Sequence, residues 1–195
     1  MEREKYSQSA YLPRTSIIMK WIFKILGLCL LLGILAYILL FIRPYRVSGD
    51  SMDPTLQNNA IILIDTFLPR VWFFKRSDIV VYTLNNEIRI KRILGLDGEK
   101  ITIKEGKIYS DNTLIFEKYL NPNLRTCVPW SCIELTEKIY QVPENSYFVL
   151  GDNRENSRDS RGCLDAISCE KSAIYYVPRW DVIGKYLFAL PSFSK

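Results

Sequence analysis

The stretch DIVVYTLNNEIRIKRILGL, residues 78–96, decides the fold class of most of this chain. Its two halves are rich in isoleucine, valine and tyrosine, which favour strands, and Asn85-Asn86 between them is a turn signal. Three further runs have the same character: AIILIDTF (60–67), KITIKEGKIYS (100–110) and SYFVLGD (146–152). We find neither a helical period of useful length after residue 42 nor an internal repeat. The sequence therefore predicts a mostly β domain at 43–195, with antiparallel sheets packed as a partly open barrel.

The segment before this domain has a different composition. Residues 25–42, ILGLCLLLGILAYILLFI, carry no charge, and eighteen residues at helical rise span about 27 Å, close to a bilayer core of roughly 30 Å. The length argues against a buried helix of a soluble protein. A cleaved signal peptide fits poorly, because no small-x-small site follows the run. We predict a single transmembrane anchor at 25–42, preceded by a cytoplasmic segment at 1–24.

The charges predict the orientation of this anchor. Residues 1–24 contain five basic and two acidic side chains, whereas only Arg43 and Arg46 follow the run closely. This asymmetry favours a cytoplasmic N-terminus and a domain on the outer side of the membrane. The net charge of +5 includes the +3 of residues 1–24, and no basic block suggests binding to nucleic acid.

Cysteine spacing fits an extracytoplasmic domain. Cys127 and Cys132 are close in sequence, as are Cys163 and Cys169, and four such residues outside the cytoplasm are typical of two short-loop disulfides. A zinc site is less favoured, because zinc ligands usually have two to four residues between them. Reduced core thiols remain the alternative, and the sequence does not fix the pairing. The first pair lies in residues 113–142, whose strand pattern is weak and which we predict to be an insertion.

The stretch VSGDSMDPTL, residues 47–56, presents Ser51 as a nucleophile is often presented, yet the chain contains no histidine to accept its proton. If this segment is extended, the neighbouring Asp50 points to the opposite face. A carboxylate near its reference pKa of about 4 is also a weak base for an alcohol. A lysine whose pKa is lowered by apolar burial is the remaining kind of base.

Lys91 is the lysine with the most apolar surroundings. In EIRIKRILGL it is flanked by isoleucine and leucine, whereas Lys100 and Lys104 belong to a more polar strand. The alternative is a lysine on a solvated strand face that it shares with Arg89. From the strand pattern alone this alternative is favoured.

Four segments in order resemble a known family. These are VSGDSMDPTL (47–56), SDIVVY (77–82), IKRILGLDGEKI (90–101) and GDNRENSRDSR (151–161). Together with an N-terminal anchor they resemble bacterial type I signal peptidase (leader peptidase), the membrane-bound Ser–Lys protease that removes signal peptides. The resemblance extends from the anchor to about Gly184-Lys185, and four motifs in one order are far more specific than any single one.

The resemblance implies Ser51 as the nucleophile and Lys91 as the general base and later general acid. It implies that the oxyanion is held by the backbone N–H of Ser51 and a group near Gly49. Some members have a hydroxyl side chain at the position of Gly49, and this chain does not. One lost oxyanion donor can lower the rate by about 10²–10³.

The last motif supplies the supporting residues that the resemblance implies. Ser157 is expected to accept a hydrogen bond from the lysine amine and orient it. Asp159 and Arg161 are expected to form a pair that braces the loop. No metal or cofactor is needed for this chemistry, and we see no ligand cluster for one.

The resemblance further implies an extended substrate at a sheet edge, with the side chains at positions −1 and −3 before the cut facing shallow apolar pockets. The residues implied to line these pockets are Tyr45, Val47, Met52, Leu56 and Ile90, for which ordinary core packing is the alternative. The implied partners are exported preproteins and the lipid bilayer, and the sequence indicates no oligomeric state. The implied location is the bacterial cytoplasmic (inner) membrane, with one crossing and the catalytic domain on the periplasmic face.

Three alternatives remain. A specialised relative that matures pilins or conjugation proteins would use the same dyad. A self-cleaving Ser–Lys regulator related to the SOS repressors would be soluble and would not need residues 25–42. An inactive membrane-tethered β module that binds exported proteins is disfavoured by the presence of Ser51, Lys91 and Asp159 together.

Overall fold

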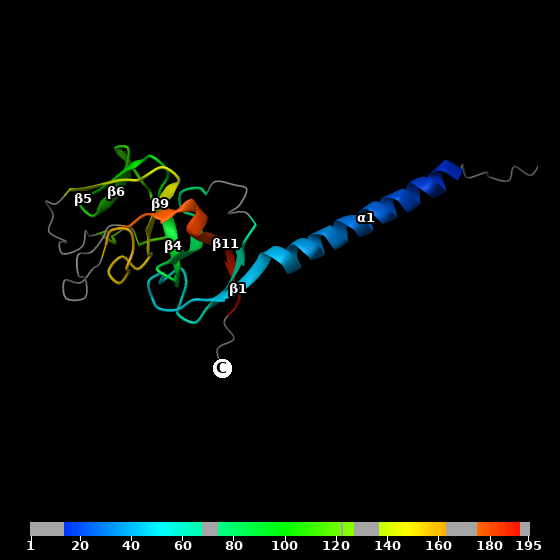
Figure 1. Cartoon of the computed structure of the whole chain (residues 1–195), viewed down its shortest axis with the longest axis horizontal. Helices are drawn as coiled ribbons and strands as arrows, with labels where there is room; N and C mark the ends of the chain where they lie inside the picture. Colours follow the sequence, from blue (N-terminus) through cyan, green and yellow to red (C-terminus); the bar gives the residue numbers. More distant parts are fainter. Residues whose placement is uncertain (1–13, 68–73, 122, 127–136, 163–174, 192–195) are drawn as a thin grey trace, which may run out of the picture. The chain divides into compact units, whose positions relative to one another are not determined.

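The computed structural model describes residues 14–67, 74–121, 123–126, 137–162 and 175–191 (Figure 1). It divides the chain into two compact units, Met1–Phe41 and Ile42–Lys195. The boundary coincides with the end of the first helix.

The first unit contains one helix, α1 (Arg14–Phe41), of 28 residues. Its segment Ile18–Phe41 has a mean hydropathy of 2.5 and is long and apolar enough to cross a membrane. Leucines along this segment are exposed, as Leu30 and Leu39 illustrate, each at 65%. A helix that is apolar all round needs an apolar environment, so this composition fits a membrane anchor. The helix begins before residue 25, because backbone hydrogen bonding continues through the basic residues that precede the apolar run.

The larger sheet of the second unit contains seven antiparallel strands. In spatial order they are β1 (Ile42–Arg46), β2 (Ile61–Asp65), β11 (Val182–Ala189), β3 (Ile79–Leu84), β4 (Glu87–Gly95), β9 (Ser146–Leu150) and β10 (Val177–Pro178). A 3₁₀ turn, η1 (Arg179–Asp181), connects β10 to β11. β1 is the first strand in this order and therefore lies at an edge of the sheet, with a strand on one side only. Pro44 has no backbone N–H to donate to a second neighbouring strand, and an edge strand does not need one.

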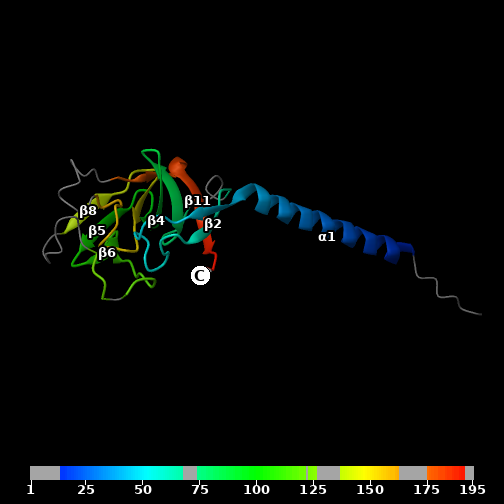
Figure 2. The ribbon, with the colours of Figure 1, turned by 90° about the horizontal axis from the view of Figure 1, so that it is seen from below.

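The smaller sheet contains four antiparallel strands in the order β7 (Thr113–Leu114), β6 (Lys107–Ser110), β5 (Lys100–Lys104) and β8 (Lys138–Gln141). Figures 1 and 2 both show β5 and β6 at one end of the β domain and β11 at the other. Residues 113–142 thus contribute β7 and β8, which are too short for their sequence pattern to predict. The four paired cysteines of the disulfide prediction lie outside the described residues.

The turn at Asn85-Asn86 fixes the register of the β3–β4 hairpin. Both asparagines have positive φ, 51° and 65°, the left-handed region that a two-residue hairpin turn requires and that asparagine tolerates. Leu84 consequently pairs with Glu87, and the ladder continues without a shift to Val80 opposite Lys91. The position of Lys91 is therefore set by the turn rather than by a long connection.

Three clusters of buried apolar side chains form the core of the β domain. The third lies beneath the segment that carries Ser51, and its fully or nearly fully buried members are Val47, Met52, Leu56, Ile62, Ile64, Ile79 and Val81. Burial of a side chain of this size stabilises a fold by about 1.5–3 kcal/mol. Apolar packing thus holds the candidate nucleophile segment against β2 and β3.

Candidate active site

Ser51 lies in a tight turn between β1 and β2. The Asp53 N–H donates to the Asp50 carbonyl at 3.1 Å, and the Leu56 N–H donates to the Met52 carbonyl at 2.9 Å. The segment is therefore not extended, and the premise used to set Asp50 aside is wrong, although Asp50 itself is exposed. Met52 and Leu56 are each only 1% exposed and anchor the turn in the core, whereas Ser51 is partly exposed.

Gly49 gives this turn its shape. Its φ of +86° lies in the left-handed region, which glycine adopts without strain. Its N–H donates to Asn58 Oδ1 at 3.1 Å. That donor is therefore engaged in this structure, and the group near Gly49 expected to hold the oxyanion stays a prediction.

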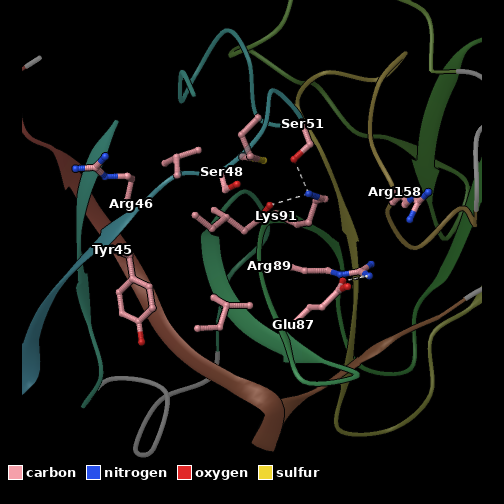
Figure 3. A pocket seen from close by; sticks show the side chains of 12 residues that line it. Tyr45, Arg46, Ser48, Ser51, Glu87, Arg89, Lys91 and Arg158 are labelled. Carbon is pink, nitrogen blue, oxygen red and sulfur yellow. Dashed lines mark hydrogen bonds and ion pairs between the residues drawn. The ribbon is translucent and has the colours of Figure 1, made fainter. Parts of the chain in front are cut away.

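Lys91 of β4 meets Ser51 directly. Its Nζ donates to Ser51 Oγ at 2.7 Å and to the Ile90 carbonyl at 3.0 Å (Figure 3). The residue is 5% exposed. Burial lowers the pKa of the Lys91 ammonium from 10.5 to about 8, and this outweighs the negative charge of Asp159, which raises it. The strand pattern favours a lysine on a solvated face, and this alternative is therefore wrong for Lys91.

Three segments are joined at Asp152, which sequence reasoning missed. Its carboxylate accepts two hydrogen bonds from Arg92, at 2.9 and 2.6 Å, and one from Thr55 Oγ1 at 2.6 Å. The next residue, Asn153, donates its N–H to the Ser51 carbonyl at 3.1 Å. These bonds connect the serine turn, the lysine strand and the loop after β9. The acidic residue within GDNR was the signal available in the sequence.

Asp159 and Arg161 form a second buried pair in the same loop. Arg161 Nε and Nη2 donate to the two oxygens of Asp159, each at 2.8 Å, and both side chains are fully buried. Asp159 also accepts the Gly151 N–H at 3.1 Å, and Arg161 donates to the Arg154 carbonyl at 2.9 Å. The pair thus ties both ends of the loop together and has its charges and hydrogen bonds matched, as burial requires.

Ser157 does not make the hydrogen bond expected of it. Its Oγ is buried, and among the described residues it has no hydrogen-bond partner. The Lys91 amine instead donates to Ser51 and Ile90. Ser157 lies against Gly151, where an added Cβ would be 2.1 Å from Ser157 Oγ and 2.4 Å from the Ser51 carbonyl. The absence of a side chain at Gly151 is what allows this close approach.

A further cluster of side chains contacts Arg92. The Arg92 guanidinium lies 3.7 Å from the ring centroid of Tyr119, whose hydroxyl donates to Glu117. Glu117 in turn forms an ion pair with Arg154, whose side chain is fully buried. No motif in the sequence singled out Glu117 or Tyr119, because they are brought to the site only by the fold.

A cavity of about 400 Å³ opens beside Ser51 and Lys91. Four residues predicted for the substrate pockets line it: Tyr45, Val47, Met52 and Ile90. Leu56 is not among the lining residues and belongs to the core beneath, so its assignment to a pocket is a correction. Within the described part of the chain, no group of three or more His, Cys, Asp or Glu side chains could hold a metal ion.

The sequence profile of the family described as "Signal peptidase, peptidase S26" matches residues 18–190. The chain belongs to this signal peptidase family. It is 34% identical over 159 residues to signal peptidase I S of Bacillus subtilis, covering 80% of this chain and 85% of that protein. It is 39% identical over 157 residues to signal peptidase I P of Bacillus subtilis subsp. natto, covering 77% and 82%.

More distant signal peptidases also match. Signal peptidase IB of Staphylococcus aureus is 29% identical over 176 residues, covering 82% of this chain and 86% of that protein. A crystal structure of a signal peptidase I from Enterococcus faecalis has a TM-score of 0.43 and 23% identity, covering 59% of this chain and 97% of that chain.

Family membership confirms the resemblance read from the four motifs and confirms that the chain is a signal peptidase serine protease. It supports signal peptide removal as the reaction and signal-peptide-bearing preproteins as the substrates. The predicted fold class is also confirmed, since the β domain consists of antiparallel sheets and follows one apolar helix.

Proposed function

We propose that this chain is a membrane-anchored endopeptidase that removes N-terminal signal peptides from exported preproteins, with Ser51 as nucleophile and Lys91 as general base. The observation that carries the proposal is the 2.7 Å contact between Ser51 Oγ and the buried Lys91 Nζ. With a pKa of about 8, a useful fraction of this amine is neutral near physiological pH. The pair therefore supplies the proton acceptor that a chain without histidine lacks.

In the first step the neutral Lys91 amine accepts the hydroxyl proton of Ser51 along their hydrogen bond. Ser51 Oγ forms a bond to the carbonyl carbon of residue −1, and the carbonyl oxygen takes the negative charge. When the tetrahedral intermediate collapses, the Lys91 ammonium returns its proton to the leaving amine. The mature protein leaves, and the signal peptide remains as an ester on Ser51.

In the second step the neutral Lys91 amine activates a water molecule by accepting one of its protons. The resulting hydroxide attacks the ester carbonyl, and the ammonium then gives the proton back to Ser51 Oγ. The products are the enzyme in its starting form and the signal peptide with a free C-terminal carboxyl group, which ionises by releasing its proton to solvent. One buried amine therefore serves both halves of the reaction.

The oxyanion is held by the backbone N–H of Ser51 in this mechanism. The Asp50 carbonyl belongs to the same peptide unit as this N–H, and it accepts hydrogen bonds from the Asp53 N–H and from Asn153 Nδ2, each at 3.1 Å, which orient the unit. Gly49 contributes the backbone conformation rather than a donor, since its N–H is bonded to Asn58. Asp159 and Arg161 support the site by holding the 151–161 loop in place.

The substrate binds as an extended strand beside β4 and β1. β9 pairs with β4 only from Arg92 onward, so residues 87–91 have an open edge next to the cavity. An extended peptide can satisfy such an edge by main-chain hydrogen bonds. Its side chains at −1 and −3 then point to one face, where Val47, Met52 and Ile90 accept small residues.

The proposed location follows from the apolar helix and the charge distribution. The uncharged run that begins at residue 25, within the candidate helix Ile18–Phe41, forms the membrane crossing, and the basic residues of 1–24 stay in the cytoplasm. The β domain then faces the outside of the cytoplasmic membrane, where signal peptides emerge.

Purified full-length protein in detergent, mixed with a general preprotein, tests the proposal. Ser51→Ala and Lys91→Ala are each expected to abolish cleavage and to retain the cooperative thermal unfolding of the parent. Lys104→Ala is the matched control, because this lysine lies on an exposed strand position of the smaller sheet. Near-normal turnover by Lys91→Ala would remove Lys91 from the mechanism. A parent protein that leaves general preproteins uncut would instead point to a specialised processing peptidase.

A further inference from the structure

The cavity beside Ser51 and Lys91 has a charged side as well as an apolar one. Its lining includes Glu87, Arg89 and Arg158 in addition to the apolar residues. Figure 3 shows Glu87 and Arg89 joined as an ion pair below Lys91, with Arg158 to the right and Arg46 to the left. None of these charges takes part in the proton transfers of the proposed reaction, so their presence in the substrate cavity needs a different explanation.

Strand alternation on β4 separates the two sides. Successive side chains of a strand point to opposite faces, so Ile88 and Ile90 share one face while Glu87, Arg89 and Lys91 share the other. The β3–β4 ladder shows no register shift between Glu87 and Arg92, so this alternation is uninterrupted. The apolar face is the one to which positions −1 and −3 are assigned. The next position, −2, must then point to the face that carries Glu87 and Arg89.

The charges on that face leave a net positive potential. Arg89 Nη2 lies 2.7 Å from Glu87 Oε2, and these two charges largely neutralise each other. Arg158 is exposed, and no carboxylate of a described residue lies within ion-pair distance of it. Arg158 lines the same cavity as this pair. The hydrogen bond from Arg89 and, more weakly, the charge of Arg158 lower the pKa of Glu87, in keeping with this arrangement. One guanidinium thus remains available to a ligand.

We propose that Arg158, together with the Glu87–Arg89 pair, forms a charge-reading subsite that favours an acidic side chain at position −2 of the preprotein. The proposal rests on the proposed function, because it needs a peptide bound with its scissile bond at Ser51. An aspartate or glutamate at −2 forms an ion pair with Arg158, and a lysine there is repelled. Because Arg158 is solvent-exposed, the selectivity is modest, about threefold to fivefold in kcat/KM.

A charge-swap experiment tests the subsite. The substrates are three preproteins that differ only at −2, with alanine, aspartate or lysine, and the readout is kcat/KM of the full-length enzyme in detergent at low ionic strength. Measurement well above the pKa of Lys91 keeps that amine neutral with every substrate. The parent is expected to favour aspartate over lysine, Arg158→Gln to treat both about equally, and Arg158→Glu to favour lysine. The preference of the parent is expected to shrink in 1 M salt, where charges are screened beyond about 3 Å.

Arg46→Glu is the matched control. It makes the same change of charge in the same cavity, but on the side away from Arg158 (Figure 3). It is expected to retain the preference of the parent for aspartate at −2. Equal loss of preference in Arg46→Glu and Arg158→Glu would overturn the assignment to Arg158, because the effect would then be that of net charge.

The alanine preprotein separates this inference from the proposed function. If the parent cleaves it and shows no preference between aspartate and lysine, the subsite is wrong and the dyad stands. If the parent does not cleave it, the proposed function fails first. The rate of each Arg158 variant with the aspartate and lysine substrates is divided by its rate with the alanine substrate, so that a general effect of the substitution cancels.

Discussion

Lys91 Nζ lies 2.7 Å from Ser51 Oγ, although the two residues are 40 positions apart in the sequence. The hairpin turn at Asn85-Asn86 sets the position of the amine, and the core beneath Met52 sets the position of the hydroxyl. A second bond, from the lysine amine to the Ile90 carbonyl, limits its rotation. Burial then adjusts the charge of the amine, so geometry and pKa arise from the same packing.

The rate of cleavage should follow the deprotonation of Lys91. With its pKa near 8, kcat/KM is expected to rise tenfold per pH unit below pH 8 and to level off above it. Stopped assays across this range, with a preprotein that has no titrating group near the cut, measure the profile. A rate independent of pH from mildly acidic to strongly alkaline conditions would rule out this base.

The charge of Arg89 should tune that profile. Its positive charge lowers the pKa of Lys91, so Arg89→Gln is expected to move the midpoint of the profile to higher pH. The matched control is Arg46→Gln, which lies on the other side of the cavity and should leave the midpoint in place. An unchanged midpoint in Arg89→Gln would mean that solvent screens this interaction completely.

Protonated Lys91 should destabilise the fold, and the sign follows from its lowered pKa. Below pH 8 the amine is charged in both the folded and the unfolded states, so the whole cost of burying the charge is present. Between pH 8 and pH 10.5 only the unfolded state is protonated, and the free energy of unfolding rises with pH. Lys91→Met lacks this amine. The free energy of unfolding of Lys91→Met minus that of the parent is therefore expected to fall by about 3 kcal/mol across this window.

Urea unfolding of the full-length protein in detergent, followed at several pH values, measures this difference. Effects of the substitution that do not depend on pH, such as a change in packing, are removed by comparing only the pH dependence of the two proteins. A difference that is flat between pH 8 and pH 10.5 would contradict a lowered pKa for Lys91.

Gly151→Ala should damage the active site more than the fold. The new Cβ would lie 2.1 Å from Ser157 Oγ and 2.4 Å from the Ser51 carbonyl, so the nucleophile turn must shift. Overpacking of this kind costs about 1–3 kcal/mol, and we expect kcat to fall by at least tenfold. Gly95→Ala is the comparison, because its Cβ would meet Ile101 and Phe148 in the core instead. It should lower the unfolding temperature with little effect on kcat in the protein that remains folded.

Tyr119 should act as a positioning residue through Arg92. Tyr119→Leu removes the ring under the guanidinium, a contact typically worth about 0.5–2 kcal/mol. Tyr119→Phe keeps the ring and loses the hydroxyl's bond to Glu117 and its longer bond, at 3.5 Å, from Arg154. We expect Tyr119→Leu to lower kcat about tenfold with little change in KM, and Tyr119→Phe to lower it less. Steady-state kinetics distinguishes the two. A purely structural role would lower the unfolding temperature of both variants and leave kcat of the folded enzyme unchanged.

The cysteine pairs at 127/132 and 163/169 remain a prediction, since they lie outside the described residues. Non-reducing mass spectrometry of the full-length protein is expected to find two intrachain disulfides. Four alkylated thiols under the same conditions would show that these cysteines are reduced.

The sequence by itself determined the division of this protein into an apolar helix and a β domain, because both signals are local. A charge-free run of eighteen residues and strand-favouring runs separated by Asn–Asn or Asp–Gly turns each depend on neighbours in the chain. The four motifs likewise led to the prediction that Ser51 and Lys91 are the reacting pair, because each motif is a short local stretch of sequence. The strands β1 and β11 were not predicted, because Pro44 interrupts one, and the other follows a segment without clear turn signals.

Only the tertiary structure decided what surrounds the two reacting atoms. Strand pattern alone favoured a solvated Lys91, and burial reversed this because the serine turn and the loop after β9 cover the amine. Asp152, Glu117 and Tyr119 became part of the site through contacts between segments far apart in the chain, and Ser157 lost its expected bond through the same packing. Contacts of this kind depend on how strands and loops meet in space, and no local pattern of residues encodes them.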